Sequence, residues 1–92
     1  MEDAVATVNP MLERAARAVA TRRLAYDFGY PAEHEIVQTA VNARWRDYAD
    51  EARDVIASLA DPDDTVLNHV KPVKEHPEFV ARWNGHIAAI VG

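Results

Sequence analysis

Histidines are the first residues in this 92-residue chain whose type and spacing could do chemistry, because a neutral imidazole is a common metal ligand. His34-Glu35 begins a pattern similar to H-E-x-x-H, in which two histidines four residues apart bind zinc from one face of a helix. Position 38 is Gln, so the second imidazole is missing. The chain also has no cysteine, which removes thiolate ligands and disulfides. We therefore expect no metal site and no cofactor.

Carboxylates and a lone serine offer the next candidates for chemistry. Asp47, Asp50 and Asp54 share one side of a predicted helix. Acid–base work by such residues needs a concave, partly desolvated setting, whereas Asp50 is spaced to pair with Arg53 on a solvated helix face. Ser58 has no base near it in sequence, which leaves nucleophilic catalysis without support. We expect that the protein is not an enzyme and has no catalytic residues.

Three arginines and three apolar residues between positions 14 and 30 are candidates for contact with another protein. They are Arg14, Arg17, Arg22, Leu24, Phe28 and Tyr30. The arginines could meet an anionic partner, or they could form an ordinary solvated helix face. The apolar residues could cover the end of a helical hairpin, or they could form an exposed patch of the kind that marks an interface. We take these six residues as the candidate protein interface.

The helix that must position these residues has clear signals at both ends. Asn9 can cap it, Pro10 suits its first position, and Gly29 followed by Pro31 ends it, so the sequence predicts a helix over 10–28. At about 100° per residue one apolar arc forms on this helix. Its members are Leu12, Ala15, Ala16, Val19 and Tyr26.

A second helix is predicted over 32–60, where there is neither glycine nor proline, and it is either continuous or kinked near Asn42-Ala43-Arg44. Its larger apolar residues recur at spacings of three and four, as in a coiled-coil seam, from Val37 through Trp45 and Ala52 to Val55 and Leu59. We expect these larger side chains to pack against the small alanines of the first helix. We therefore predict a long antiparallel hairpin of the helices at about 10–28 and 32–60.

The rest of the chain predicts two further helices that cover this hairpin. Asp61-Pro62 repeats the capping pattern of the first helix and starts a short helix over 62–71, and a C-terminal helix spans 77–91. Residues 1–8 carry no cap and are expected to be a flexible or partner-ordered arm. The predicted fold class is all-α, with a single helical domain over 9–92.

Composition limits the partners. The chain is 49% apolar and carries a formal net charge of −5, which opposes general binding to nucleic acid because phosphate contacts supply most of that affinity. No apolar run approaches the length of a membrane span, and the chain begins with acidic residues where a signal peptide is basic. We expect a cytoplasmic protein that does not insert into membranes.

Several packing positions resemble those of a known group of proteins. They are Ala15-Ala16-Arg17-Ala18, the pattern Trp45-x-x-Tyr48-x-x-x-Ala52-Arg53-x-Val55-Ile56-x-x-Leu59, and Asp61-Pro62. This pattern, over about residues 11–67, is similar to short Ala/Arg-rich helical accessory proteins of tailed phages and prophages from GC-rich bacteria. The resemblance implies a phage accessory protein acting in the host cell, and it transfers no catalytic residue.

These observations favour a non-enzymatic protein-binding module, one that binds a host protein and modulates or inhibits it. Two alternatives remain open. The chain could be a structural homo-oligomer, such as a homodimer that pairs through its arm or its C-terminal helix. Less favoured is a DNA-binding helix-turn-helix protein, because the reading helix would lie among acidic residues.

Overall fold

The computed structural model describes residues 9–92, and every regular element among them is helical, so the predicted all-α class is confirmed. The elements are α2 (Pro10–Phe28), α3 (Glu35–Arg44), the 3₁₀ turn η1 (Trp45–Tyr48), α4 (Ala49–Ala57), α5 (Asp64–Leu67), the 3₁₀ turn η2 (Val73–Glu75) and α6 (His76–Val91). The chain forms two compact units, Met1–Asp54 and Val55–Gly92, each of which is described by itself.

Helix α2 begins and ends where its sequence predicts. The Asn9 side chain accepts a hydrogen bond from the backbone N–H of Met11 at 2.8 Å, which satisfies one of the free donors of the first turn. Gly29 follows the helix with φ at 75°, in the left-handed region, and its N–H donates to the carbonyl oxygen of Ala25 at 2.9 Å. Glycine adopts this conformation without a Cβ penalty, so it ends the helix at low cost.

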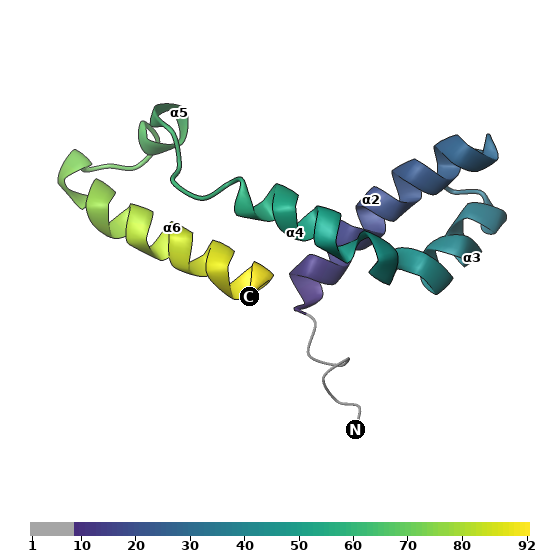
Figure 1. Ribbon diagram of the computed structural model, residues 1–92. Helices are drawn as coiled ribbons and strands as arrows, with labels where there is room; N and C mark the ends of the chain where they lie inside the picture. Colours follow the sequence, from purple (N-terminus) through teal and green to yellow (C-terminus); the bar gives the residue numbers. More distant parts are fainter. Residues whose placement is uncertain (1–8) are drawn as a thin grey trace, which may run out of the picture. The chain divides into compact units, whose positions relative to one another are not determined.

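The core of the first unit lies between α2 and the segment from α3 to α4. Figure 1 shows α2 and α3 side by side, and α2 also packs against η1. The buried side chains are Leu12, Ala16, Ala20 and Leu24 of α2, Val37 and Val41 of α3, Trp45 of η1 and Ala52 of α4. Two leucines and two alanines of α2 thus form this core with residues of α3, η1 and α4.

The buried stripe of α2 differs from the predicted arc. It repeats every four residues from Leu12 to Leu24, whereas Tyr26, a member of the predicted arc, is 87% exposed. The sequence is compatible with both the predicted arc and the observed stripe, because alanines lie on several sides of α2 and a methyl group fits a core and a surface equally well. Tyr26 therefore does not belong to the buried stripe.

The single helix predicted over 32–60 is interrupted. Helix α3 begins only at Glu35, after a turn at residues 31–34, and η1 replaces the α-helix at Trp45–Tyr48 before α4 ends at Ala57. The change begins at Arg44, whose φ of −128° and ψ of 5° depart from helical values. A 3₁₀ turn has three residues per turn, so it rotates the residues that follow relative to α3 while the large indole of Trp45 is taken into the core.

In the second unit, the predicted helix over 62–71 shortens to α5, which covers only Asp64–Leu67. Its cap is Asp63, which accepts from the backbone N–H of Val66 at 3.1 Å, and not Asp61 as predicted. Asp61 has φ at 58°, and this left-handed conformation differs from the extended backbone of an N-cap. The predicted C-terminal helix over 77–91 corresponds to α6, which begins one residue earlier.

Three predictions about organisation are left as predictions: the long hairpin, its covering by the two later helices, and a single domain over 9–92. The arm at residues 1–8 lies outside the described residues. From Asn9 onward, none of the helices combines the length and the apolar character that a membrane crossing requires.

Leu24→Ala tests the buried stripe of α2. Leu24 is 1% exposed, so its truncation leaves a cavity and should lower the free energy of unfolding by about 2–5 kcal/mol. Met11→Ala, in the same helix at 52% exposure, is the matched control and should change it by only about 0.5 kcal/mol. Urea titrations followed by circular dichroism measure both values. Equal effects of the two substitutions would contradict the assigned stripe.

Candidate protein-binding surface

The turn between α2 and α3 is held by hydrogen bonds along its whole length. The N–H of Tyr30 donates to the carbonyl oxygen of Ala25 at 3.2 Å, and the N–H of His34 donates to the carbonyl oxygen of Pro31 at 3.0 Å. The side-chain amide of Gln38 reaches back to the carbonyl oxygen of Ala32 at 2.8 Å. These hydrogen bonds hold the backbone of the turn from both of its ends.

His34 has a structural role at this turn. Its Nδ1 accepts from the backbone N–H of Ile36 at 3.1 Å, which caps α3, and its ring stacks on Tyr30 with 4.2 Å between centroids. An imidazole nitrogen can accept such a bond only when it carries no proton. The histidine of the incomplete H-E-x-x-H pattern is thus a helix cap and a support for Tyr30.

Apolar side chains remain exposed around this fixed turn. Phe28 is 39% exposed, Tyr30 is 43% exposed and Ile36 is 48% exposed. The predicted interface residues Phe28 and Tyr30 therefore do lie at the surface. Ile36 was missed, although its position one residue before the core residue Val37 signals that it points elsewhere. We define Phe28, Tyr30 and Ile36 as the turn surface.

Leu24, in contrast, is a core residue and not part of the turn surface. It completes the four-residue repeat of Leu12, Ala16 and Ala20, so its side chain is turned toward α3 and η1. The prediction that Leu24 contacts a partner is wrong, because a side chain that is 1% exposed offers no surface.

The Arg17 side chain contacts other residues of the first unit. Its guanidinium lies 5.4 Å from the centre of the Trp45 ring, donates to Glu13 at 2.8 Å and donates to the side-chain oxygen of Asn42 at 2.7 Å. Arg46 lies over the same indole at 4.5 Å. The two cations attract the electron-rich faces of the ring, and their stems cover the indole. Arg17, like Leu24, therefore has a structural role in the first unit.

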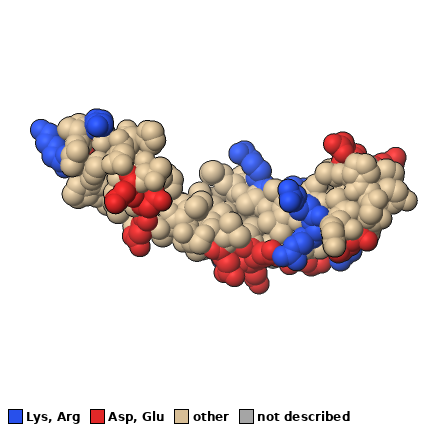
Figure 2. Space-filling view, turned by 90° about the horizontal axis from the view of Figure 1, so that it is seen from above, with Lys and Arg blue, Asp and Glu red and all other residues tan. Residues whose placement is uncertain are grey.

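Arg14 and Arg22 are exposed on α2, away from the turn surface. At 1.5 Å per residue, Arg14 lies about 21 Å along the helix axis from Phe28. The charges close to the turn surface are instead the exposed carboxylates Asp27, Glu33 and Glu35, and Figure 2 shows acidic groups at this end of the first unit. The six predicted interface residues thus divide between a core position, the turn surface and the side of α2.

Arg17→Ala tests the structural role of this arginine. Loss of the contacts to Trp45, Glu13 and Asn42 should lower the free energy of unfolding by about 1–2 kcal/mol. Arg14→Ala, which removes the same side chain from an exposed position three residues away, should change it by only about 0.5 kcal/mol. Denaturant titrations of both variants give the comparison. A larger loss in Arg14→Ala would overturn the assignment.

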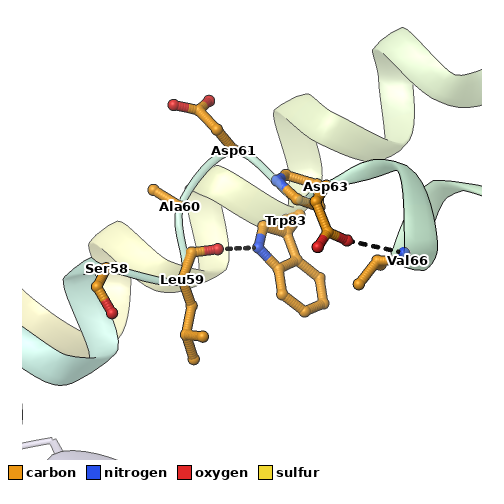
Figure 3. Close-up of a pocket in the computed structure, with 8 residues that line it drawn as sticks. Ser58, Leu59, Ala60, Asp61, Asp63, Val66 and Trp83 are labelled. Atoms are coloured by element: carbon orange, nitrogen blue, oxygen red, sulfur yellow. Dashed lines mark hydrogen bonds between the residues drawn. The ribbon is translucent and has the colours of Figure 1, made fainter.

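A small hollow of about 200 Å³ lies in the second unit, beside Trp83 (Figure 3). Leu59, Pro62, Asp63 and Val66 line it together with the indole. The Trp83 Nε1–H donates to the carbonyl oxygen of Leu59 at 2.7 Å, and the Asp61 side chain points away from the ring. The indole and Asp63 are thus already bonded to the loop that surrounds them, which explains their positions without a ligand.

Asn84, the residue after Trp83, holds the same loop. Its side-chain oxygen accepts from the backbone N–H of Asp61 at 2.7 Å, and its side-chain nitrogen donates to the Asp61 carboxylate at 2.9 Å. This reciprocal pair stabilises the left-handed backbone of Asp61, which an L-residue with a side chain adopts at a cost. Trp83 and Asn84 together therefore fasten the loop at residues 59–61 to α6.

Trp83→Phe should weaken this fastening without removing the aromatic packing. The loss of one N–H donor leaves the Leu59 carbonyl oxygen without its partner and should cost about 1 kcal/mol. Amide hydrogen exchange of the 59–61 loop and of α6 measures the change. Val73→Ala, at a 65% exposed position of the same unit, is the control and should leave this exchange as in the unchanged protein. Unaltered exchange in Trp83→Phe would contradict the role of the indole N–H.

No group of histidine and carboxylate side chains that could hold a metal ion occurs between Asn9 and Gly92. Asp50 is paired with Arg53 at 2.8 Å on an exposed face, as predicted, and Ser58, in the turn after α4, donates to the carbonyl oxygen of Val55 at 2.6 Å. These residues have ordinary structural partners. The geometry of the described residues thus favours the turn surface as the candidate site.

Comparison with known proteins identified no relative: no family model, no curated protein and no solved structure matches this chain.

Proposed function

We propose that this chain is a non-enzymatic protein-binding module and that the turn surface of Phe28, Tyr30 and Ile36 makes the contact. The observation that carries the proposal is the exposure of two aromatic rings and an isoleucine on a turn whose backbone is fixed by hydrogen bonds. Aromatic anchors contribute much of the free energy of binding at interfaces. A turn that is already ordered loses little conformational entropy when it binds.

The charges beside the turn surface define the partner. Asp27, Glu33 and Glu35 are exposed around the apolar side chains, so a matching partner carries an apolar pocket with lysine or arginine at its rim. This reverses the sign of the complementarity expected from the arginines of α2. The resemblance to phage accessory proteins supports a host protein as this partner, with modulation or inhibition as the result of binding.

Paired variants test the proposal. The chain and its Phe28→Ala/Tyr30→Ala variant are immobilised separately and exposed to the same cell extract, and the retained proteins are quantified by mass spectrometry. A partner of the turn surface is retained by the unchanged chain and lost by the variant. For the recovered protein, the dissociation constant measured by calorimetry should rise at least about tenfold in the variant, since each ring is an anchor.

Two controls separate binding from folding. Both rings are at least 39% exposed, so circular dichroism of the variant should match that of the unchanged chain. Leu59→Ala removes a side chain of similar exposure from the second unit and should retain the same partner. The proposal fails if every retained protein binds the double variant as well as the unchanged chain.

A further inference from the structure

Helix α2 has a second apolar face, on the side opposite its buried stripe. Its members lie within an arc of about 100° around the helix axis, and they are Met11, Ala15, Ala18, Val19, Arg22 and Tyr26. Tyr26 lies about 160° around the helix axis from the buried Leu24. An ordinary surface helix is polar on this side, whereas here only Arg22 is charged. We call this set the outer stripe.

Four members of the outer stripe are exposed, and the other two, Ala15 and Val19, are half-buried. Met11 is 52% exposed and Tyr26 is 87% exposed, and these two large side chains stand at its ends, about 22 Å apart along the axis. Ala15 and Ala18 lie between them. Small residues in the middle of a helix face allow a second helix to approach to about 8 Å, while the larger end residues pack along its sides.

Two guanidinium groups accompany the outer stripe. Arg14 and Arg22 are exposed and lie about 12 Å apart along α2. Glu13 pairs with Arg17 and Glu51 pairs with Arg23, whereas Asp27, near the C-terminal end of α2, is exposed. A largely apolar face with one positive charge on it and another beside it thus exists on a chain whose net charge is −5.

This charge pattern selects among possible occupants. A symmetric pairing of two copies through the outer stripe would bring the arginines of both helices together, and like charges at such a contact cost free energy. A helix with an apolar face and carboxylates seven or eight residues apart would instead pair with both Arg14 and Arg22. Its apolar face would cover Ala15, Ala18 and the two end residues.

We propose that the outer stripe of α2 is a docking site for an acidic amphipathic helix of about 15 residues supplied by another protein. The site is separate from the turn surface, and the variants that test the two do not overlap. Binding combines burial of the apolar stripe with charge pairing at Arg14 and Arg22, so its affinity falls as salt concentration rises.

The probe for this site is a synthetic 18-residue helical peptide with a leucine and alanine face and glutamates seven residues apart. A matched peptide has lysine in place of each glutamate. Fluorescence anisotropy with the full chain should show binding of the glutamate peptide and at least about tenfold weaker binding of the lysine peptide. Equal binding of both peptides, or binding of neither, overturns the proposal.

Variants of the chain locate the bound peptide. Arg22→Glu and Ala18→Glu should each weaken binding of the glutamate peptide at least about tenfold. Lys74→Glu makes the same charge change as Arg22→Glu at an exposed position of the second unit and should leave binding unchanged. If Lys74→Glu weakens binding as much as Arg22→Glu does, the attraction is not local to α2 and the proposal is wrong.

Two further measurements exclude other occupants. The free chain should be a monomer by light scattering, and a dimer that Ala18→Glu dissociates would assign the outer stripe to a second copy instead. Ala18→Glu should also leave the thermal unfolding midpoint of the free chain within about 2 °C, because position 18 is exposed. A drop of several degrees would show that a segment of the chain itself covers the stripe.

Discussion

The close approach of α2 to α3 and η1 is the constraint on which the first unit depends. Ala16 and Ala20 are fully buried, and the side chains opposite them include Val37, Val41 and Trp45. A larger residue at either alanine would separate the helices, because a packed core has no space for added methylene groups. This contact fixes the distance between the end of α2 and the start of α3, and so it also sets the path of the turn that exposes Phe28 and Tyr30.

Local signals in the sequence predicted the ends of α2 but not its orientation. Asn9 and Gly29 act through backbone geometry and hydrogen bonds within a few residues, so their types alone indicate a start and an end. Which side of α2 is buried depends on the neighbouring helix. Alanine carries little information about burial, and the stripe through Leu24 and the arc through Tyr26 were therefore hard to distinguish from the sequence.

Local signals also predicted part of the candidate site, whereas contacts between distant residues could not be predicted. Phe28 ends α2 and Tyr30 follows its C-cap Gly29, so the helix-stop signal at Gly29 placed both residues at the turn. The role of Arg17 depends on Trp45, which is distant in sequence, and the role of Asp61 depends on Asn84. Pairs of residues that are far apart in sequence produce no periodic pattern. From the sequence alone, Arg17 therefore looks like an ordinary surface charge and Asp61 looks like a helix cap.

The pairing of Asn84 with Asp61 also affects how the protein ages. Asn84 precedes Gly85, and asparagine followed by glycine is the sequence in which side-chain deamidation meets least steric resistance. Replacement of the amide by a carboxylate removes the N–H that donates to Asp61 and places two negative charges next to each other. The helical backbone and the paired hydrogen bonds protect the amide, so the bond that fastens the loop to α6 also slows the reaction that would break it.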